Sequence, residues 1–325
     1  MDRTIRFHST GAADVLMHEE IETGEPGPGE VRIRQNFAGV NFLDIYHRTG
    51  LYSVPSLPAT PGVEAVGVVE RVGPGVLDFK PGQRVAWAGL PMGGYAQARI
   101  IPAARLLAIP ARLPDRLLAG ALLRGLTTHM LLHEVTRTGP GSRIAVTAAA
   151  GGLGTMLCRW ASRLGADVIG IVGNPAKVER ARAAGAGEVI VHSQEDFPTA
   201  VRALTGGLGV DAMFDGVGGS MLLQCLDCVR PFGLVASLGQ ASGSLPDIPL
   251  VELGPKRSIA IARPSVMGYI SDTARYRTAA ASFFQMLIEG LTVDIGPDYL
   301  LEDARAAHLA LEQGLTTGTI RLDLR

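Results

Sequence analysis

The chain has 325 residues, of which 47% are hydrophobic and 19% are charged, and its formal net charge is −1. This composition predicts a globular protein of two domains and excludes a disordered chain. The small net charge excludes a general electrostatic attraction to nucleic acid or anionic membranes, and no apolar run reaches membrane length. Three cysteines without disulfide-framework spacing, and a start without a signal-peptide core, predict a cytoplasmic protein with reduced thiols.

The first third of the chain is β-rich. Runs of valine and isoleucine predict strands at 31–40, 63–73, 83–88 and 95–102. Glycine and proline clusters between these runs predict tight turns. The pattern is typical of an antiparallel, barrel-like domain.

The pattern changes near residue 112. Apolar spacing predicts one helix over 115–135, after which strand-like and helical runs alternate. In segment 174–187, Asn174 can cap a helix, Pro175 suits its first position and Gly185 can end it. Strand–helix alternation predicts parallel pairing in a doubly wound α/β sheet. Its strands are expected at 143–148, 167–173, 188–192, 211–217, 234–239 and 258–263.

The last sixty residues depart from this alternation. They predict two helices, at 273–290 and 301–314, and a final strand at 318–324. That strand could return to the first domain. We therefore predict one domain from residues 1–122 and 266–325, with a second domain, residues 123–265, inserted into it.

Residues 148–154, AAAGGLG, lie between a predicted strand and a predicted helix. Aligned with G-x-G-x-x-G, Gly151 and Gly154 fill the second and third glycine positions, and Ala149 replaces the first. Gly151 would let the backbone approach a pyrophosphate, and Gly154 would let the helix pack close to the strand. The free N–H groups and the dipole of the helix favour that phosphate. The loop predicts a dinucleotide site, with a purely structural turn as the alternative.

The end of the second strand of this sheet distinguishes NAD from NADP. NAD-binding folds usually carry an acidic residue there, whereas this strand ends in Gly173 and Asn174. Lys177 in the next helical turn can reach a 2′-phosphate, and His192 at the end of the third strand can add a donor. The combination favours NADP(H). Taken singly, Lys177 is equally well an ordinary surface lysine, and His192 an incidental strand-end histidine.

Four segments together resemble a known family: FAGVNFLDIYHRTGLY (37–52), PGVEAVGVVERVGPGV (61–76), AAAGGLG (148–154) and ARPSVMGYI (262–270). Over essentially the whole chain they resemble the zinc-free quinone oxidoreductases of the medium-chain dehydrogenase/reductase superfamily. The resemblance implies a GroES-like β-barrel catalytic domain, a doubly wound parallel-sheet Rossmann domain and NADPH as cofactor. It also implies a homodimer, paired through the β-branched edge strand near 258–266; burial of that segment under a helix is the alternative.

The residues present argue against a metal site. Zinc-dependent relatives carry a cysteine just before the helix that holds the counterpart of Asp44, and a G-H-E motif where this chain has GVE. Here position 39 is glycine, positions 40 and 63 are valine, and only Asp44 and Glu64 persist. Because a catalytic zinc needs about three protein ligands, we expect no metal.

Cys225 and Cys228 have C-x-x-C spacing within a helix-like run, QCLDCVR. No second pair accompanies them, so we expect core and surface positions, not metal ligands.

The resemblance implies that the segment after residue 40 lines the catalytic cleft. Asn41 is expected on the nicotinamide side of the cofactor. Tyr46 and Tyr52 are expected as hydrogen-bond donors near cofactor or substrate, because a phenol can donate to an oxyanion. Packing at a loop is the alternative for each tyrosine. Asp44 is as well suited to capping a helix as to catalysis.

The resemblance also implies contacts from other segments. Thr127 would contact the nicotinamide end or the pyrophosphate, and Gly239, after a parallel strand, would let the cofactor approach. Arg263 would contact the 2′-phosphate or a ribose, or else be a surface or dimer arginine. Arg124 stands where relatives often have lysine and keeps the charge with another geometry. The full expected cofactor set is Asn41, Thr127, Ala150, Gly151, Gly152, Leu153, Gly173, Asn174, Lys177, His192, Gly239 and Arg263.

Three functions follow as hypotheses. The first is metal-independent reduction of quinones by NADPH, since quinones accept reducing equivalents without a Lewis acid. The second is NADPH-dependent reduction of conjugated alkenals or enones, which the cleft tyrosines do not distinguish from the first. The third is a non-catalytic NADPH-binding protein; the absence of a long basic run argues against an RNA-binding role.

Overall fold

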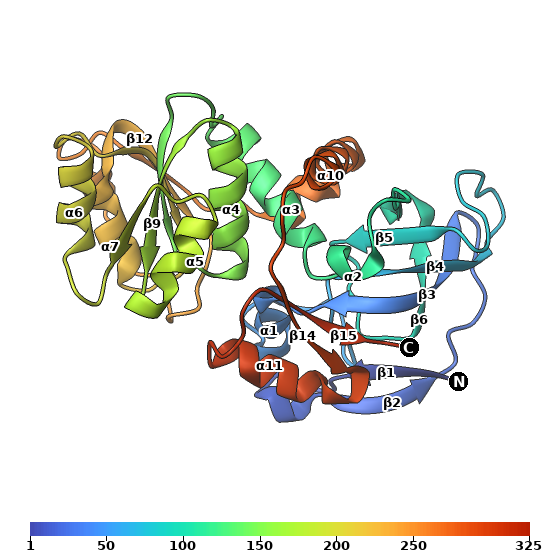
Figure 1. Ribbon diagram of the computed structural model, residues 1–325. Helices are drawn as coiled ribbons and strands as arrows, with labels where there is room; N and C mark the ends of the chain where they lie inside the picture. Colours follow the sequence, from blue (N-terminus) through green and yellow to red (C-terminus); the bar gives the residue numbers. More distant parts are fainter. The chain divides into compact units, whose positions relative to one another are not determined.

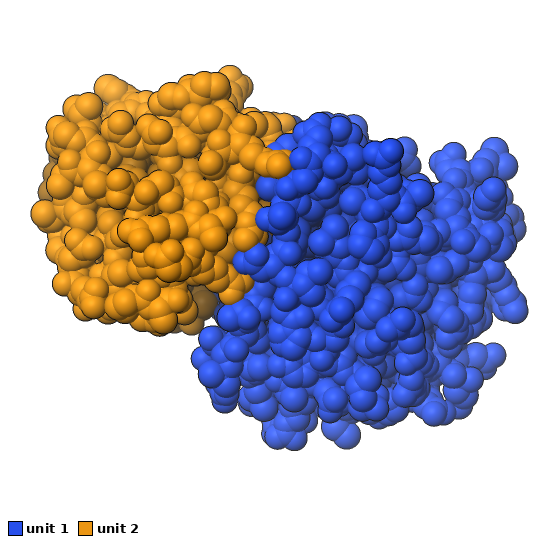
Figure 2. Space-filling view, viewed as in Figure 1, with its two compact units in different colours: residues 1–126, 267–325 blue, residues 127–266 orange.

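The computed structural model describes residues 1–325. The chain divides into two compact units (Figure 2): unit 1 is Met1–Leu126 with Met267–Arg325, and unit 2 is Thr127–Val266. The functional domain boundaries expected from the sequence, 122/123 and 265/266, stay a prediction. None of the helices combines the length and the apolar character that crossing a membrane requires.

Unit 1 is built on a seven-stranded sheet of order β14-β15-β3-β4-β5-β7, with β6 also paired to β3. These strands are β3 (Glu30–Gly39), β4 (Glu64–Val72), β5 (Arg84–Ala88), β6 (Ala98–Pro102), β7 (Leu107–Ala108), β14 (Ile295–Leu300) and β15 (Thr319–Asp323). Unit 1 also has a separate two-stranded sheet, formed by β1 (Asp2–Arg6) and β2 (Met17–Ile21). Its helices are α1 (Phe42–Thr49), α2 (Asp115–Leu118), α10 (Thr273–Ile288) and α11 (Ala304–Glu312), with α9 (Val266–Ser271) at the unit boundary. The pairs are antiparallel except β14 with β15. The sheet encloses a core that includes Phe7, Ile33, Trp87, Tyr95 and Ile101, so the antiparallel barrel-like prediction is confirmed.

The C-terminal strand does return to the first part of the chain. β15 pairs antiparallel with β3, placing Arg321 opposite Gly39 and Leu322 opposite Ala38. Both strands are almost wholly buried at this point. Burial of apolar side chains therefore holds the N-terminal and C-terminal parts of the chain together in unit 1.

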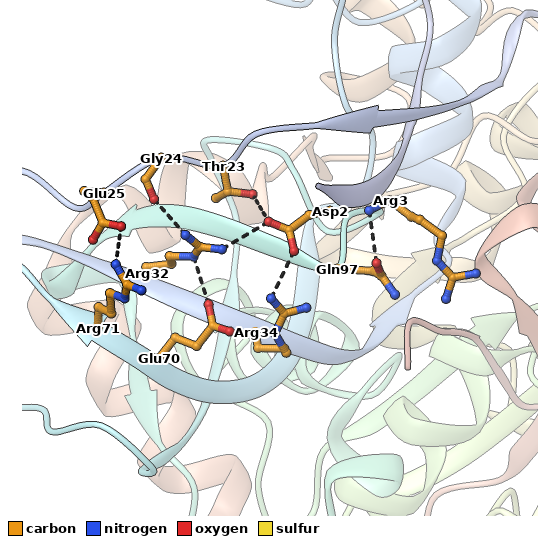
Figure 3. A network of polar contacts seen from close by, with 10 residues as sticks. All are labelled: Asp2, Arg3, Thr23, Gly24, Glu25, Arg32, Arg34, Glu70, Arg71 and Gln97. Atoms are coloured by element: carbon orange, nitrogen blue, oxygen red, sulfur yellow. Dashed lines mark hydrogen bonds and ion pairs between the residues drawn. The ribbon is translucent and has the colours of Figure 1, made fainter.

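β1 and β2 were not expected from the sequence, because MHEEI and DRTIR alternate polar and apolar residues only weakly. They pair antiparallel with each other. A polar network anchors β1 to the sheet (Figure 3): Asp2 accepts hydrogen bonds from Thr23, Arg32 and Arg34, and both guanidinium groups also pair with Glu70 on β4. Two arginines shared between two carboxylates thus connect three strands.

The single helix predicted over 115–135 is wrong. Gly120 has φ +81 and separates α2 from α3 (Leu122–His129), which then continues as a π-helical segment, Met130–Val135. An added Cβ at Gly120 would lie 3.1 Å from the Ile320 carbonyl oxygen, so β15 also crowds this position. The left-handed backbone ends the helix, which apolar spacing alone does not reveal.

Unit 2 contains a six-stranded sheet of order β10-β9-β8-β11-β12-β13, in which every pair is parallel. The strands are β8 (Arg143–Thr147), β9 (Asp167–Val172), β10 (Glu188–Val191), β11 (Val210–Asp215), β12 (Val229–Ser237) and β13 (Ala260–Ala262). Helices α4 (Gly152–Arg163), α5 (Val178–Ala183), α6 (Phe197–Leu204), α7 (Met221–Cys225) and α8 (Leu250–Leu253) connect them (Figure 1). The doubly wound parallel sheet is confirmed. Strand order reverses between β8 and β11, where such sheets bind ligands beyond their carboxyl ends.

Two local predictions in unit 2 need correction. Asn174 precedes a 3-10 turn, Pro175–Lys177, and its side chain makes no capping hydrogen bond; the α-helix begins only at Val178. Gly185 has φ +92 after α5, as a helix-ending glycine requires. Cys225 and Cys228 are both buried in the core, so the expected surface position is wrong. Burial raises the pKa of both thiols, which keeps them protonated.

Candidate functional site

The glycine-rich loop of unit 2 connects β8 to α4. Gly151 is the N-cap of α4, and its N–H donates to the Ala148 carbonyl oxygen at 2.7 Å. A Cβ on Gly154 would lie 2.2 Å from that same oxygen, and one on Gly151 would lie 3.0 Å from it. Gly154 therefore lets α4 begin directly against the strand end, and the first N–H groups of the helix, which no helix satisfies internally, face the loop.

Ala149 takes the place of the usual first glycine because its neighbour makes room. It is fully buried, and a Cβ on Gly170 of β9 would lie 3.1 Å from the Ala149 Cβ. The methyl group of Ala149 thus lies opposite a glycine in the adjacent strand. Ala148 takes φ +48, a left-handed conformation uncommon for a residue with a Cβ, at the turn itself.

The ends of β9 and β10 bring three of the expected cofactor residues together. Gly173, Lys177 and His192 are all exposed there. A Cβ on Gly173 would lie 3.4 Å from His192 Nε2, and the His192 N–H donates to the Val172 carbonyl oxygen. No carboxylate residue ends either strand. The surface that follows β9 is therefore exposed, and the residues expected to bind the cofactor there include a lysine and a histidine but no acidic residue.

On the other side of the reversal point, the ends of β8, β11 and β12 are connected through Asp215, which was not predicted as a site residue. Its buried carboxylate accepts from Thr147 Oγ1 at 3.0 Å and from the backbone N–H groups of Val217 and Gly218. Thr147 Oγ1 in turn accepts from Gly216 N at 2.9 Å. The sequence signal that could have found it is an aspartate ending a buried strand before a glycine-rich turn.

Gly239 lies against this turn. Its N–H donates to the Asp215 carbonyl oxygen, and a Cβ on it would lie 1.9 Å from the Gly216 carbonyl oxygen. Glycine at 239 is thus already required by protein packing, which is a second reason for it beside cofactor approach. Thr127 is half-buried on α3 at the first position of unit 2.

Arg263 lies just past β13 and donates to Ser237 Oγ at 3.2 Å and to Gln240 Oε1 at 3.1 Å. β13 is four strands from β9 in the sheet order, which at about 4.8 Å per strand is roughly 19 Å. Lys177 and Arg263 therefore follow strands on opposite sides of the reversal point. Both contacts expected for Arg263, with the 2′-phosphate or with a ribose, stay predictions.

In unit 1, Asn41 is the N-cap of α1, and its environment is defined by two buried carboxylates. Its Nδ2 donates to Glu64 Oε1 at 2.7 Å and its backbone N–H donates to Asp44 Oδ2 at 2.8 Å. Asp44 is the third helical residue, so it completes a capping box. Glu64 Oε2 also accepts from Leu123 N. Of the two roles left open for Asp44, the structure places it in the cap.

Burial dominates the electrostatics of this pair. It raises the pKa of Asp44 to about 7, with nearby Glu64 contributing in the same direction and the Asn41 N–H opposing. It also raises the pKa of Glu64 against the hydrogen bonds from Asn41 and Leu123. The Arg124 charge also opposes the rise in the pKa of Glu64, so this carboxylate is held by neutral donors and one nearby cation.

Tyr46 and Tyr52 come together beside this cap. Their rings form an edge-to-face pair with centroids 5.3 Å apart, and Tyr52 N donates to the Tyr46 carbonyl oxygen. Phe42, on the same face of α1, has its ring centroid 6.2 Å from that of Tyr46. Both phenols are partly exposed. The structure therefore brings the two predicted tyrosines into one aromatic surface.

The comparisons with known proteins agree over the whole chain. Residues 27–111 match the alcohol dehydrogenase GroES-like domain, and residues 152–285 match the zinc-binding dehydrogenase family. A 2-haloacrylate reductase from a Burkholderia species is 41% identical, covering 97% of both chains, and quinone oxidoreductase 1 of Escherichia coli is 36% identical, covering 98% of both. The solved structure of Escherichia coli quinone oxidoreductase complexed with NADPH has a TM-score of 0.95 at 36% identity and covers 99% of both chains.

A GroES-like domain with a Rossmann domain defines a medium-chain dehydrogenase/reductase. Within that superfamily, the chain belongs to the quinone oxidoreductase family.

One matched family is described as zinc-binding, so the fit of a zinc ion can be tested on the residues. No group of three or more His, Cys, Asp or Glu side chains is arranged to hold a metal. At position 39, a Cβ would lie 2.4 Å from Glu64 Oε1 and 2.6 Å from the Gly120 Cα. A cysteine cannot occupy that position without displacing both neighbours, and Asn41 already holds Glu64. The residues present do not fit zinc.

Proposed function

We propose that this protein is an NADPH-dependent quinone reductase that works without a metal. Full-length similarity to quinone oxidoreductases supports the class. The observation that supports the cofactor assignment is the surface after β9, where Gly173 lies against His192, exposed Lys177 follows four residues later, and no acidic residue ends the strand.

The residues of unit 2 fit NADPH. The loop residues Ala150, Gly151, Gly152 and Leu153 would hold the pyrophosphate through the N-terminus of α4, whose first N–H groups have no acceptor within the helix. Lys177 and His192 would hold the 2′-phosphate, beside Gly173 and Asn174. The nicotinamide half would follow the ends of β11 and β12, past Gly239. NADPH supplies the reducing equivalents for the reaction.

Unit 1 would contribute the polar groups of the reaction. Asn41 would face the nicotinamide side, and the Tyr46 and Tyr52 hydroxyls would donate to the oxygen on which negative charge develops. A phenol hydroxyl can donate such a hydrogen bond without a metal. The catalytic domain would comprise residues 1–122 and 266–325, and the NADPH domain residues 123–265.

The proposal includes a homodimer. β13 is an edge strand with only one partner, β12, and its residues are partly exposed. Phe232 and Leu250, which line one surface hollow with Ala260 of β13, are 87% and 82% exposed. An apolar sheet edge of this kind favours pairing with a second copy. Sedimentation at micromolar concentration would test this, with a monomer contradicting it. A cytoplasmic location stays a prediction.

A second function is favoured by one observation. The 2-haloacrylate reductase, which is 41% identical, acts on a small conjugated alkene according to its name. Reduction of a conjugated alkene by NADPH would use the same cofactor site with a different acceptor.

The experiment compares acceptors in the presence of a strong chelator. NADPH oxidation is followed with a small quinone, a polycyclic quinone, a conjugated enone and 2-chloroacrylate, with NADH as the cofactor control. Turnover that requires a quinone, prefers NADPH and ignores the chelator supports the proposal. Turnover only with enone or haloacrylate moves the assignment to the second function. Tight NADPH binding with no turnover contradicts both and supports a binding-only role.

A further inference from the structure

A row of buried polar side chains in unit 1 connects α11 to the N-terminus of α1. Glu312 accepts from Arg48 Nη2 at 2.6 Å, and Arg48 Nη1 lies 3.2 Å from His308 Nδ1. His308 Nε2 lies 3.0 Å from the Tyr95 hydroxyl, which lies 3.2 Å from Asp44 Oδ2. Arg48, His308, Tyr95 and Asp44 are at most 1% exposed. Contacts this short between buried groups fix where each hydrogen must be.

The number of hydrogens that each side chain can donate fixes the direction of every hydrogen bond in the row. A guanidinium can only donate, so His308 Nδ1 must accept from Arg48. A neutral imidazole then carries its hydrogen on Nε2, which donates to the Tyr95 oxygen. The remaining Tyr95 hydrogen points to Asp44. Burial and the neighbouring Arg48 charge lower the pKa of His308 to about 3, which agrees with a neutral ring.

Asp44 is the acceptor at which this row ends. Its Oδ2 accepts hydrogen bonds from the Tyr95 hydroxyl and the Asn41 N–H. Its buried Oδ1 has no hydrogen bond of ordinary geometry, although the nearby Val63 N–H also lowers the pKa of the carboxyl. Tyr95 is therefore the one side-chain donor that offsets the burial of this carboxylate. The other charged groups near it are Glu64 on β4, which opposes its ionisation, and Arg48, whose charge is paired with Glu312 and acts through the row.

We propose that Tyr95 and His308 are positioning residues, which orient the Asp44 carboxylate so that Asp44 and Glu64 together hold Asn41 in its working geometry. The inference rests on the proposed function, because Asn41 matters to turnover only there. The row does not conduct protons to the site: its outer end is a guanidinium, which stays protonated. Its effect is on orientation and charge.

The first test is the pH profile of kcat/KM for NADPH-dependent quinone reduction. Because the Tyr95 hydroxyl favours the charged form of Asp44, Tyr95→Phe should raise the pKa of Asp44. The fall of kcat/KM on the acid side of the profile should then occur about one pH unit higher. His308→Leu should move it in the same direction, and His308→Gln, which keeps a donor toward Tyr95, should restore most of the shift. A merely structural role would lower activity at every pH alike.

Tyr276→Phe is the matched control. Tyr276 is a fully buried phenol of the same unit whose hydroxyl contacts only Ala88 N and the Arg105 carbonyl oxygen. Its removal should lower stability without moving the limb. A folded Tyr95→Phe protein whose limb coincides with that of the wild type would overturn the inference.

The second test does not depend on turnover or on the variants folding well. In wild-type protein labelled with ¹⁵N-histidine, His308 should appear as the Nε2–H tautomer and should not titrate between pH 5 and 9. The chain has seven histidines, and the signal of His308 is assigned as the one that is absent from the spectrum of His308→Gln. A titrating ring, or an Nδ1–H tautomer, overturns the hydrogen-bond direction. Absence of quinone turnover in wild type, with the expected tautomer present, would instead reject the proposed function alone.

Discussion

The candidate site residues of the two units are held in different ways. In unit 2 the loop is built from backbone: the Ala148 carbonyl oxygen lies where a Cβ on Gly151 or Gly154 would crowd it, and the first N–H groups of α4 would supply the donors. In unit 1 the site is made by side chains: Asn41 is held by two carboxylates and, behind them, by Tyr95 and His308.

The difference matches the two tasks. A pyrophosphate is large and fully charged, and backbone N–H groups at a helix end suit it whatever the neighbouring side chains are. A reacting carbonyl gains charge only during the reaction, so the groups near it must be oriented in advance. The comparison predicts that the site of unit 2 depends most on its loop glycines, and that the site of unit 1 depends most on the side chains behind Asn41.

The largest effect should come from Gly154→Ala. The new Cβ would lie 2.2 Å from the Ala148 carbonyl oxygen, so the start of α4 must move away from β8. We expect a loss of about 3 kcal/mol in the free energy of unfolding and little remaining NADPH affinity. Urea denaturation and an NADPH titration measure both. Gly139→Ala is the control, since nothing lies within 4 Å of a Cβ there. Equal behaviour of the two variants would contradict a backbone-built site.

Lys177→Ala should come next, and should act on one cofactor only. An ammonium that contacts the 2′-phosphate contributes a charge-assisted hydrogen bond, so Kd for NADPH should rise about 10- to 100-fold while Kd for NADH changes less than about twofold. Lys256→Ala, an exposed lysine of the same unit paired with Glu252, is the control. Equal losses for both cofactors would reject the 2′-phosphate assignment.

Thr147→Val tests the comparison within unit 2, where one side chain stabilises the turn after β11. It removes the hydroxyl that connects buried Asp215 with the Gly216 N–H, and leaves both groups short of a partner. We expect about 2 kcal/mol less stability and weaker NADPH binding. A change below about 0.5 kcal/mol in urea denaturation would show that the turn does not need this contact.

The smallest effect should follow Asp2→Asn in the network of Figure 3. Burial raises the pKa of Asp2, but hydrogen bonds from Thr23 and Arg34, with the nearby arginine charges, outweigh it and the pKa is lowered. Its stabilising effect, about 1 kcal/mol because Arg34 is largely exposed, is therefore present above pH ~4 and lost as pH falls through that lowered value. Stability curves of the two proteins should converge at low pH; a constant gap would contradict this.

Much of unit 2 could be predicted from local patterns. The strands at 143–148 and 167–173, the glycine loop and the missing acid after β9 are each visible within a few residues. Unit 1 was harder: β1 and β2 were missed, and the break at Gly120 was not seen, because these depend on neighbours that lie far along the chain.

The sequence by itself determined the order of elements, the nucleotide loop and the family resemblance, since each of these is a pattern of neighbouring residues. Tertiary structure decided which distant groups meet. Ala149 fits because Gly170 faces it in the next strand, and Arg48 meets His308 across 260 positions of the chain. Asp44 became part of a capping box and a buried row together, although its sequence context left its role open. The physical reason is that burial and hydrogen-bond direction depend on every group around a side chain, and most of those groups here are not neighbours in sequence.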